Sequence, residues 1–244
     1  MAFRRHRPAK EGSEGHDRAR ACQCSFWGAA AVLRGAEGIA AAGRPVTLRP
    51  MLKLGITGGI GCGKSAVARL LEAHGFRRLD SDQIVRERLL TAPDVIAALR
   101  AHFGPEILRG GVVDRPALAA RVFPVPAERE WLEGLLHPRV TAAWAEAFAG
   151  GGGDARWVVE VPLLFEKGLE KWFDFTVCVA LSREVQLMRV VERGLSPEMA
   201  AQRIRAQWPQ GRKIELADFV LWNDGASEFL EAQVGRLVRS LRPA

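Results

Sequence analysis

The residues of this chain with the clearest chemical meaning form a glycine-rich loop that ends in a lysine and a serine. Residues 58–65 read Gly-Gly-Ile-Gly-Cys-Gly-Lys-Ser, which fits the pattern G-x-x-x-x-G-K-[ST]. Glycines let the backbone curl so that successive N–H groups point at an anionic phosphate. Lys64 can then reach the β- and γ-phosphates, and the Ser65 hydroxyl can ligate Mg²⁺. The sequence therefore predicts a site for a nucleoside triphosphate.

The segments on either side of the loop are those that position such a site. The apolar run Leu52–Thr57 predicts a buried strand. After the loop, Val67, Leu70 and Leu71 share one face and predict a helix over Ser65–His74, whose N-terminus adds a positive dipole end. The alternative is a glycine-rich turn with a chance Lys-Ser pair, and the flanking strand and helix disfavour it.

Two carboxylates follow the second predicted strand, Phe76–Leu79, in the order Asp80-Ser81-Asp82. In an open parallel sheet, ligands bind outside the carboxyl ends of the strands, which places these acids beside the phosphate loop. Asp82 could accept or orient the proton of an attacking hydroxyl during phosphoryl transfer. Alternatively, Ser81 or Asp82 caps a helix over Gln83–Leu90.

Glu160 lies in another predicted strand, Trp157–Val161, among apolar neighbours. An acid at the end of such a strand is where a phosphate-loop enzyme places a second carboxylate that supports Mg²⁺. We therefore predict that Ser65 and Glu160 form the metal site. An acid exposed at the sheet edge is the alternative, which the apolar neighbours disfavour.

Five basic residues gather after the predicted strand Phe175–Ala180. They could close over a triphosphate as a lid and stabilise the charge that is transferred. A solvated helix face is the alternative for Arg205 and Arg212. The five are Arg193, Arg203, Arg205, Arg212 and Lys213.

The alternation of strands and helices from Met51 onward predicts an α/β fold: a three-layer, P-loop NTP hydrolase-like parallel sheet with an inserted helical substrate domain (about 83–149) and a lid (about 193–215). The helices predicted inside the insertion are Gln83–Leu90, Asp94–Phe103, Pro116–Val122, Ala127–Leu136 and Pro138–Phe148. The last elements predicted are helix Arg183–Arg193, a helix that starts at Ser196-Pro197, strand Phe219–Trp222 and helix Ser227–Leu241. We interpret residues 1–50 as a disordered or upstream extension, with a small helix around Ala29–Ala42 as the alternative.

The net charge of +7 does not indicate a nucleic-acid-binding surface. Residues 1–50 hold 9 of the 35 basic and 4 of the 28 acidic residues, which leaves 26 basic and 24 acidic residues from Met51 onward. No stretch has the roughly 18–20 uncharged apolar residues of a membrane span. We expect neither nucleic acid nor a membrane as partner, and a cytoplasmic location. Cys22 and Cys24 lack a second pair at metal-ligand spacing and are interpreted as incidental thiols.

Taken together, the motifs resemble those of the dephospho-coenzyme A kinase family over Leu52 to Leu241. Besides the phosphate loop, the resemblance rests on residues 80–86 (Asp-Ser-Asp-Gln-Ile-Val-Arg), on Leu136-His137-Pro138, on residues 161–166 (Val-Pro-Leu-Leu-Phe-Glu) and on the tail Ala217-Asp218-Phe219-Val220 with Asn223-Asp224-Gly225. The resemblance implies transfer of phosphate from ATP, with Mg²⁺, to the ribose 3′-hydroxyl of dephospho-CoA, the last step of coenzyme A synthesis.

By motif match, Asp82 falls on the family's proposed catalytic base, assisted by Lys64 and Arg193. The implied nucleotide-binding residues are Gly59, Gly61, Cys62, Gly63, Lys64, Ser65, Ala66, Arg193 and Arg203, and Gln207 also matches the lid pattern. The implied substrate-binding residues are Asp82, Arg86, His137 and Pro138. Cys62 and Ala66 stand where the family usually has Ser and Thr, so we expect activity with altered oxidant sensitivity at Cys62.

Two other functions compete with this one. Another phosphate-loop kinase, acting on a nucleoside or nucleotide, would share most of these residues. A nucleotide-binding switch would share only the loop, and the chain's only asparagine is Asn223, so an Asn-Lys-x-Asp guanine-reading motif is absent from the sequence.

Overall fold

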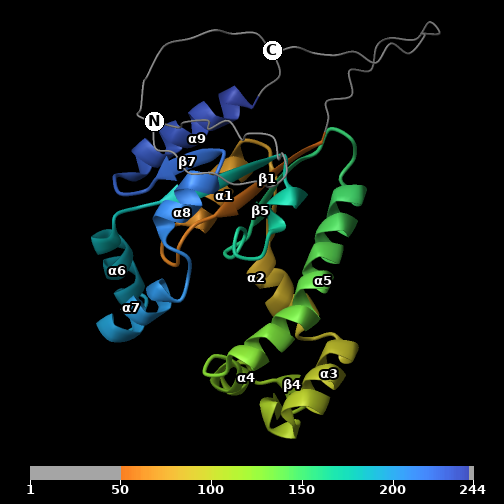
Figure 1. Ribbon diagram of the computed structural model, residues 1–244. Helices are drawn as coiled ribbons and strands as arrows, with labels where there is room; N and C mark the ends of the chain where they lie inside the picture. Colours follow the sequence, from red (N-terminus) through yellow and green to blue (C-terminus); the bar gives the residue numbers. More distant parts are fainter. Residues whose placement is uncertain (1–50, 242–244) are drawn as a thin grey trace, which may run out of the picture. The chain divides into compact units, whose positions relative to one another are not determined.

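The computed structural model describes residues 51–241 (Figure 1). The predictions for residues 1–50, including the alternative helix around Ala29–Ala42, lie outside the described residues.

A five-stranded parallel sheet forms the centre of the described chain, as the sequence predicts. Its strand order is β2-β5-β1-β6-β7, and every neighbouring pair is parallel. The strands are β1 (Leu52–Thr57), β2 (Arg77–Asp80), β5 (Arg156–Glu160), β6 (Phe175–Ala180) and β7 (Phe219–Trp222). Because the strands are parallel, Thr57, Asp80 and Glu160 end at the same edge, where ligands bind in such sheets.

One face of the sheet is covered by the first and last helices. Helix α1 (Lys64–Ala73) and helix α9 (Ser227–Ser240) pack in one apolar cluster with the strands. Alternate residues of β6, Val177 and Val179, point into this cluster, while Cys178 between them belongs to the cluster on the other face. Burial on both faces explains why these strands are continuous apolar runs rather than alternating ones.

The helical insertion follows β2, and its long helix also packs against the second face of the sheet. The elements between β2 and β5 are α2 (Ser81–Gln83), η1 (Ile84–Leu89), α3 (Pro93–Phe103), η2 (Pro105–Ile107), β3 (Leu108–Arg109), β4 (Val112–Val113), α4 (Arg115–Val122) and α5 (Pro126–Gly150). From α5, Trp144 and Phe148 join the same buried cluster as Trp157 and Val159 of β5. The β3–β4 hairpin is not predicted from the sequence, because strands of two residues leave no periodic pattern.

The helix predicted at Gln83–Leu90 is wider than an α-helix. A short α2 leads into the π-helix η1, and the backbone N–H of Leu90 donates to the carbonyl of Val85, five residues earlier, at 2.9 Å. Such widened turns are rare and occur often at functional sites. Here the turn carries Arg86.

The predicted break between Leu136 and Pro138 is wrong, because α5 continues through Pro138. A proline inside a helix costs about 3 kcal/mol. Packing offsets this cost, because the helix buries apolar residues on both sides of the proline. The buried residues are Leu136, Val140, Ala143, Trp144 and Phe148.

The remaining elements connect β5 to the end of the chain. They are η3 (Leu169–Trp172), α6 (Arg183–Val191), α7 (Pro197–Arg205, capped by the Ser196 hydroxyl) and α8 (Gln210–Leu216). The sequence predicts no helix at α8, which begins directly after Pro209 and lies inside the segment assigned to the lid. Within residues 51–241, no helix is long and apolar enough to cross a membrane.

Candidate active site at the phosphate loop

The phosphate loop takes its shape from glycines in backbone conformations that other residues avoid. Gly58, Gly61 and Gly63 have φ values of 145°, 79° and 91°. At Gly63, an added Cβ would also lie 2.2 Å from Nδ2 of Asn223. The loop therefore requires glycine at this position for two separate reasons.

Side chains from the second half of the chain hold the loop in place. Gln186 of α6 donates to the Ile60 carbonyl at 2.8 Å, and the Ile60 N–H donates to Oε1 of Gln207 at 2.8 Å. Asn223 Nδ2 donates to the Cys62 carbonyl at 2.9 Å. The motif match includes Gln207, but the sequence gives no signal for Gln186, because a glutamine on a helix resembles a solvated residue.

Lys64 lies folded into the loop. Its Nζ donates to the carbonyls of Gly58 and Gly59 at 3.1 and 3.0 Å. Burial lowers the pKa of this ammonium group below its usual value, and the opposite charge of Asp82 partly counters the shift. The two carbonyl groups carry only partial negative charge. A phosphate bound in the loop would give the ammonium group a fully charged partner.

Ser65 and Glu160 meet at the carboxyl edge of the sheet. Ser65 Oγ donates to Glu160 Oε2 at 2.7 Å, and Glu160 is only 4% exposed. The alternative of an acid exposed at the sheet edge is therefore wrong. The hydroxyl and the carboxylate are hard oxygen donors that suit Mg²⁺, which usually takes one or two protein groups beside substrate phosphates. Residues 51–241 contain no group of three or more His, Cys, Asp or Glu side chains that could hold a metal ion.

The carboxylates after β2 have separate positions. Asp80 is the N-cap of α2, since its Oδ1 accepts from the Gln83 N–H at 3.0 Å. Ser81 instead donates to the Glu160 carbonyl at 2.6 Å, so neither Ser81 nor Asp82 caps the helix. Asp82 is exposed as a residue, but its carboxyl group is partly desolvated. This loss of hydration, and then the charge of Asp80, raise its pKa, while the charge of Lys64 lowers it.

The predicted substrate-side residues lie on η1 and α5, which pack against each other. Arg86 on η1 is exposed and interacts electrostatically with Asp82. His137 is half-buried in α5, and burial lowers its pKa, while Glu133 opposes the shift. Pro138 is exposed beside it.

The predicted lid residues fall into an exposed and a buried group. Arg193, in the turn after α6, and Arg203 on α7 are exposed and make no ion pair within the described part of the chain. Lys213 of α8 is fully buried, with Nζ 3.0 Å from the Pro162 carbonyl and 2.7 Å from Glu166 Oε1. The sequence does not indicate this burial, because Lys213 follows Arg212 in a basic run.

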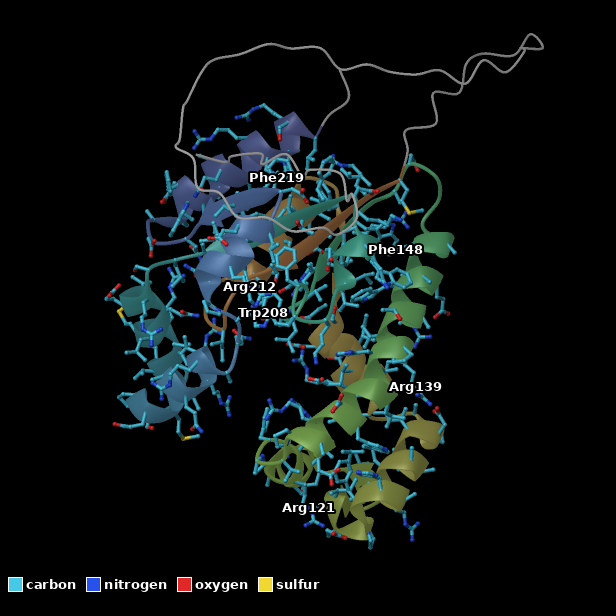
Figure 2. All side chains as sticks on the ribbon, in the orientation of Figure 1. Arg121, Arg139, Phe148, Trp208, Arg212 and Phe219 are labelled. Atoms are coloured by element: carbon cyan, nitrogen blue, oxygen red, sulfur yellow. The ribbon has the colours of Figure 1, made fainter. Side chains whose placement is uncertain are left out.

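A cavity of about 310 Å³ lies between the loop and the segment predicted to be the lid. Its lining includes Gly59, Gln186, Arg205 and Gln207. Trp208 also lines it, and the guanidinium of Arg212 stacks 3.5 Å from a ring centroid of that tryptophan (Figure 2). Arg212 is therefore bound to an aromatic ring rather than only part of a solvated face.

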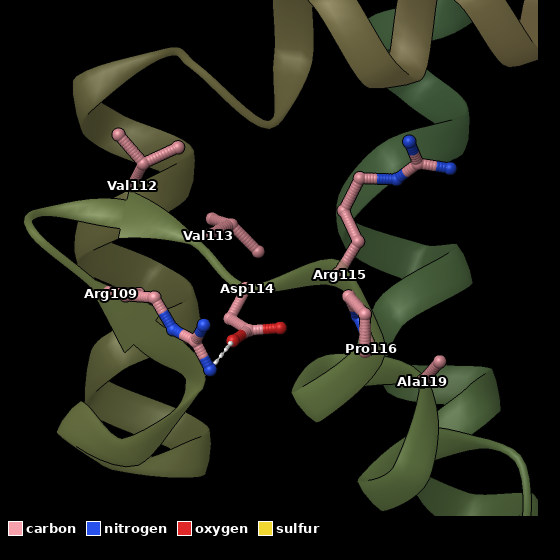
Figure 3. Close-up of a pocket in the computed structure, with 7 residues that line it drawn as sticks. All are labelled: Arg109, Val112, Val113, Asp114, Arg115, Pro116 and Ala119. Atoms are coloured by element: carbon pink, nitrogen blue, oxygen red, sulfur yellow. Dashed lines mark ion pairs between the residues drawn. The ribbon is translucent and has the colours of Figure 1, made fainter.

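A larger hollow of about 760 Å³ lies beside the β3–β4 hairpin. Figure 3 shows Arg109 paired with Asp114, the N-cap of α4, at 3.1 Å, while the Arg115 side chain points away from them. None of the predicted site residues lines this hollow, and it is open to solvent, so we do not assign the active site to it.

Cys62 of the loop is fully buried. Burial raises the pKa of its thiol above the usual value, although Lys64 partly opposes the shift. The neighbouring Ala66 has its N–H bonded to the Gly63 carbonyl at 3.0 Å, as in the first turn of a helix. The two departures from the family pattern therefore leave the loop backbone intact.

A glycine-rich loop on a parallel sheet, with a lysine in the loop and carboxylates at the ends of the adjacent strands, defines a small-molecule kinase of the P-loop class. Comparison with known proteins specifies the family. The dephospho-CoA kinase family model matches residues 52–228, and the chain belongs to this family.

Curated relatives agree with this assignment, and a solved structure has a similar fold. The chain is 41% identical over 187 residues to dephospho-CoA kinase of Streptomyces avermitilis, covering 76% of this chain and 91% of the relative. It is 37% identical over 195 residues to that of Corynebacterium efficiens, covering 78% and 98%. The crystal structure of TT1252 from Thermus thermophilus, 37% identical, superposes with a TM-score of 0.70 over 80% of this chain and all of that one.

Proposed function

We propose that this protein transfers the γ-phosphoryl group of ATP to the ribose 3′-hydroxyl of dephospho-CoA, giving coenzyme A and ADP. The observation that carries the proposal is the match of the dephospho-CoA kinase family model to residues 52–228. The electrostatic interaction of Asp82 with Lys64 of the phosphate loop supports the role proposed for Asp82. A P-loop kinase of nucleosides or nucleotides is less consistent with the family match.

In the proposed reaction, Asp82 accepts the proton of the 3′-hydroxyl as that oxygen attacks the γ-phosphorus in line. The bond from the γ-phosphorus to the bridging oxygen breaks, and ADP leaves with its electron pair. Lys64 neutralises charge on the phosphates, and the exposed Arg193 and Arg203 do so from the lid when it closes. Arg86 and His137-Pro138 bind the substrate side.

Ser65 and Glu160 would hold Mg²⁺, directly or through water. Their 2.7 Å contact brings a hydroxyl and a carboxylate to the edge where the triphosphate binds. There Mg²⁺ would supply positive charge that offsets the negative charge of the phosphates.

Substrate choice is tested by measuring ADP release from the full chain with ATP, Mg²⁺ and dephospho-CoA, with AMP and a nucleoside as controls. We expect turnover with dephospho-CoA alone. Turnover with a control instead would assign the protein to another kinase activity.

The base is tested with Asp82→Asn, for which we expect kcat to fall about 10²- to 10⁴-fold. Asp80→Asn is the matched control, because asparagine still caps α2. It should keep most of the activity at neutral pH, and because the charge of Asp80 is one cause of the raised pKa of Asp82, it should move the acid limb of the rate profile to lower pH. Since the pKa of Asp82 is raised, the acid limb of the wild-type rate profile should lie above the usual range of an aspartate. An Asp82→Asn variant within a few-fold of wild type would show that Asp82 is not the base.

A further inference from the structure

The carboxylate that accepts the Ser65 hydroxyl also binds a guanidinium that belongs to none of the motifs. Glu160 Oε2 accepts from Ser65 Oγ at 2.7 Å. Its other oxygen, Oε1, accepts from Arg78 Nε at 2.7 Å and lies 2.6 Å from Arg78 Nη2. Each oxygen of this buried carboxylate thus has its own partner.

Arg78 reaches Glu160 because of the strand register. β2 and β5 are parallel neighbours, with Arg78 opposite Val158 and Asp80 opposite Glu160. Arg78 lies two residues before Asp80, so both side chains leave the same face of the strand. The guanidinium of Arg78 lies between the carboxylates of Glu160 and Asp80, and its Nη2 is also 3.5 Å from Asp80 Oδ2.

The guanidinium provides both charge and orientation. A buried carboxylate without a counter-charge is costly, and Glu160 is 4% exposed while the Arg78 side chain is 24% exposed. The planar fork of arginine places two N–H groups on one oxygen and fixes the rotation of the carboxyl group, which a lysine would not do. The oxygen left over, Oε2, faces Ser65.

We propose that Arg78 is a positioning residue that orients Glu160 toward Ser65, so that the Mg²⁺ site is formed before Mg-ATP arrives. This inference rests on the proposed metal role of Ser65 and Glu160. Outer contacts of this kind hold metal-supporting carboxylates in place, and their removal typically costs metal affinity 10- to 100-fold.

The test is Arg78→Gln, with Arg77→Gln as the matched control one residue earlier on the same strand. Arg77 is exposed, and its guanidinium lies 5.5 Å from the Trp157 ring, so its loss should leave the site unchanged. Two quantities are measured: the Mg²⁺ concentration that gives half-maximal activity, and the part of the ADP-induced rise in Tm that requires Mg²⁺.

For Arg78→Gln we expect half-saturation at roughly 10- to 100-fold more Mg²⁺, an unchanged KM for dephospho-CoA, and a smaller Mg²⁺-dependent rise in Tm. Arg78→Lys should give intermediate values, because it restores charge without the fork. If Arg78→Gln does not fold, the same two quantities measured on Arg78→Lys still test the inference.

The inference would be overturned if Arg78→Gln or Arg78→Lys had the same Mg²⁺ dependence as the wild type. Tighter Mg²⁺ binding by either variant would also overturn it, because Arg78 would then compete with the metal for Glu160. The proposed metal role fails differently. In that case the wild-type protein itself would show no Mg²⁺-dependent stabilisation by ADP, and both ideas would be abandoned.

Discussion

The phosphate loop and the segment that follows α6 both present groups suited to a triphosphate, yet they hold their shape in opposite ways. The bends of the loop come from its own backbone, through positive φ values at Gly58, Gly61 and Gly63, and distant side chains only fix the position of the loop. The later segment is held by contacts with residues far away in the sequence, among them Gln207 with Ile60 and Lys213 with Glu166. A substitution that alters the backbone conformation should therefore disrupt mainly the loop. A substitution that removes a side-chain contact should disrupt mainly the later segment.

The largest effect is expected for Lys213→Met, which removes the buried ammonium group of α8 and leaves Glu166 without its charged partner. Breaking one side of a buried ion pair costs about 3–5 kcal/mol, so the free energy of unfolding should fall by that much in urea titrations. Adding Glu166→Gln should recover a large part of the loss, because no buried charge is then left unpaired. If Lys213→Met alone were as stable as wild type, this contact would not anchor α8.

The second comparison places alanine at two glycines with nearly equal φ, Gly63 (91°) and Gly194 (92°). Left-handed backbone costs both substitutions about 1–2 kcal/mol. Only at Gly63 would the Cβ also meet a neighbour, Asn223 Nδ2 at 2.2 Å, since nothing lies within 4 Å at Gly194. We expect Gly63→Ala to weaken ATP binding strongly in calorimetry and Gly194→Ala to leave it near wild type. Equal losses would show that backbone strain alone, and not the loop's tight packing, controls binding.

The same contrast explains how much the sequence predicts. Local patterns predict the loop, the parallel sheet and the positions of Asp82 and Glu160. Strand ends and glycine spacing can be recognised within a few consecutive residues. The contacts of Gln186, Arg78 and Lys213 do not, because each depends on which distant element packs beside it.

The long helix α5 illustrates the same limit. Pro138 predicts a break when read locally, but the apolar residues buried on both sides of it keep the helix continuous. Tertiary packing here outweighs a local penalty of about 3 kcal/mol.

A smaller effect is expected for Gln207→Ala, which removes the acceptor of the Ile60 N–H. One hydrogen bond contributes about 0.5–1.5 kcal/mol, so Tm should fall by only a few degrees. The ATP affinity should change less than in Gly63→Ala, because the loop glycines still impose their φ values. Gln202→Ala, at an exposed position of α7, is the control. A loss of ATP binding as large as that of Gly63→Ala would mean that the lid segment, and not the backbone, shapes the loop.

The smallest effect concerns Cys62, where the sequence suggests oxidant sensitivity and the structure suggests protection. The thiolate is the reactive form, and burial both raises the pKa of Cys62 and excludes reagent. Because the pKa is raised, the thiol stays neutral near pH 7 and gains reactivity only as the pH rises. We expect iodoacetamide to modify Cys62 slowly in the native protein, like Cys178, whose pKa burial raises to about 12. Modification should become fast after unfolding in urea. Peptide mass spectrometry resolves each cysteine separately, and rapid native modification of Cys62 at pH 7 would mean that the loop opens far more readily than its backbone geometry and side-chain contacts allow.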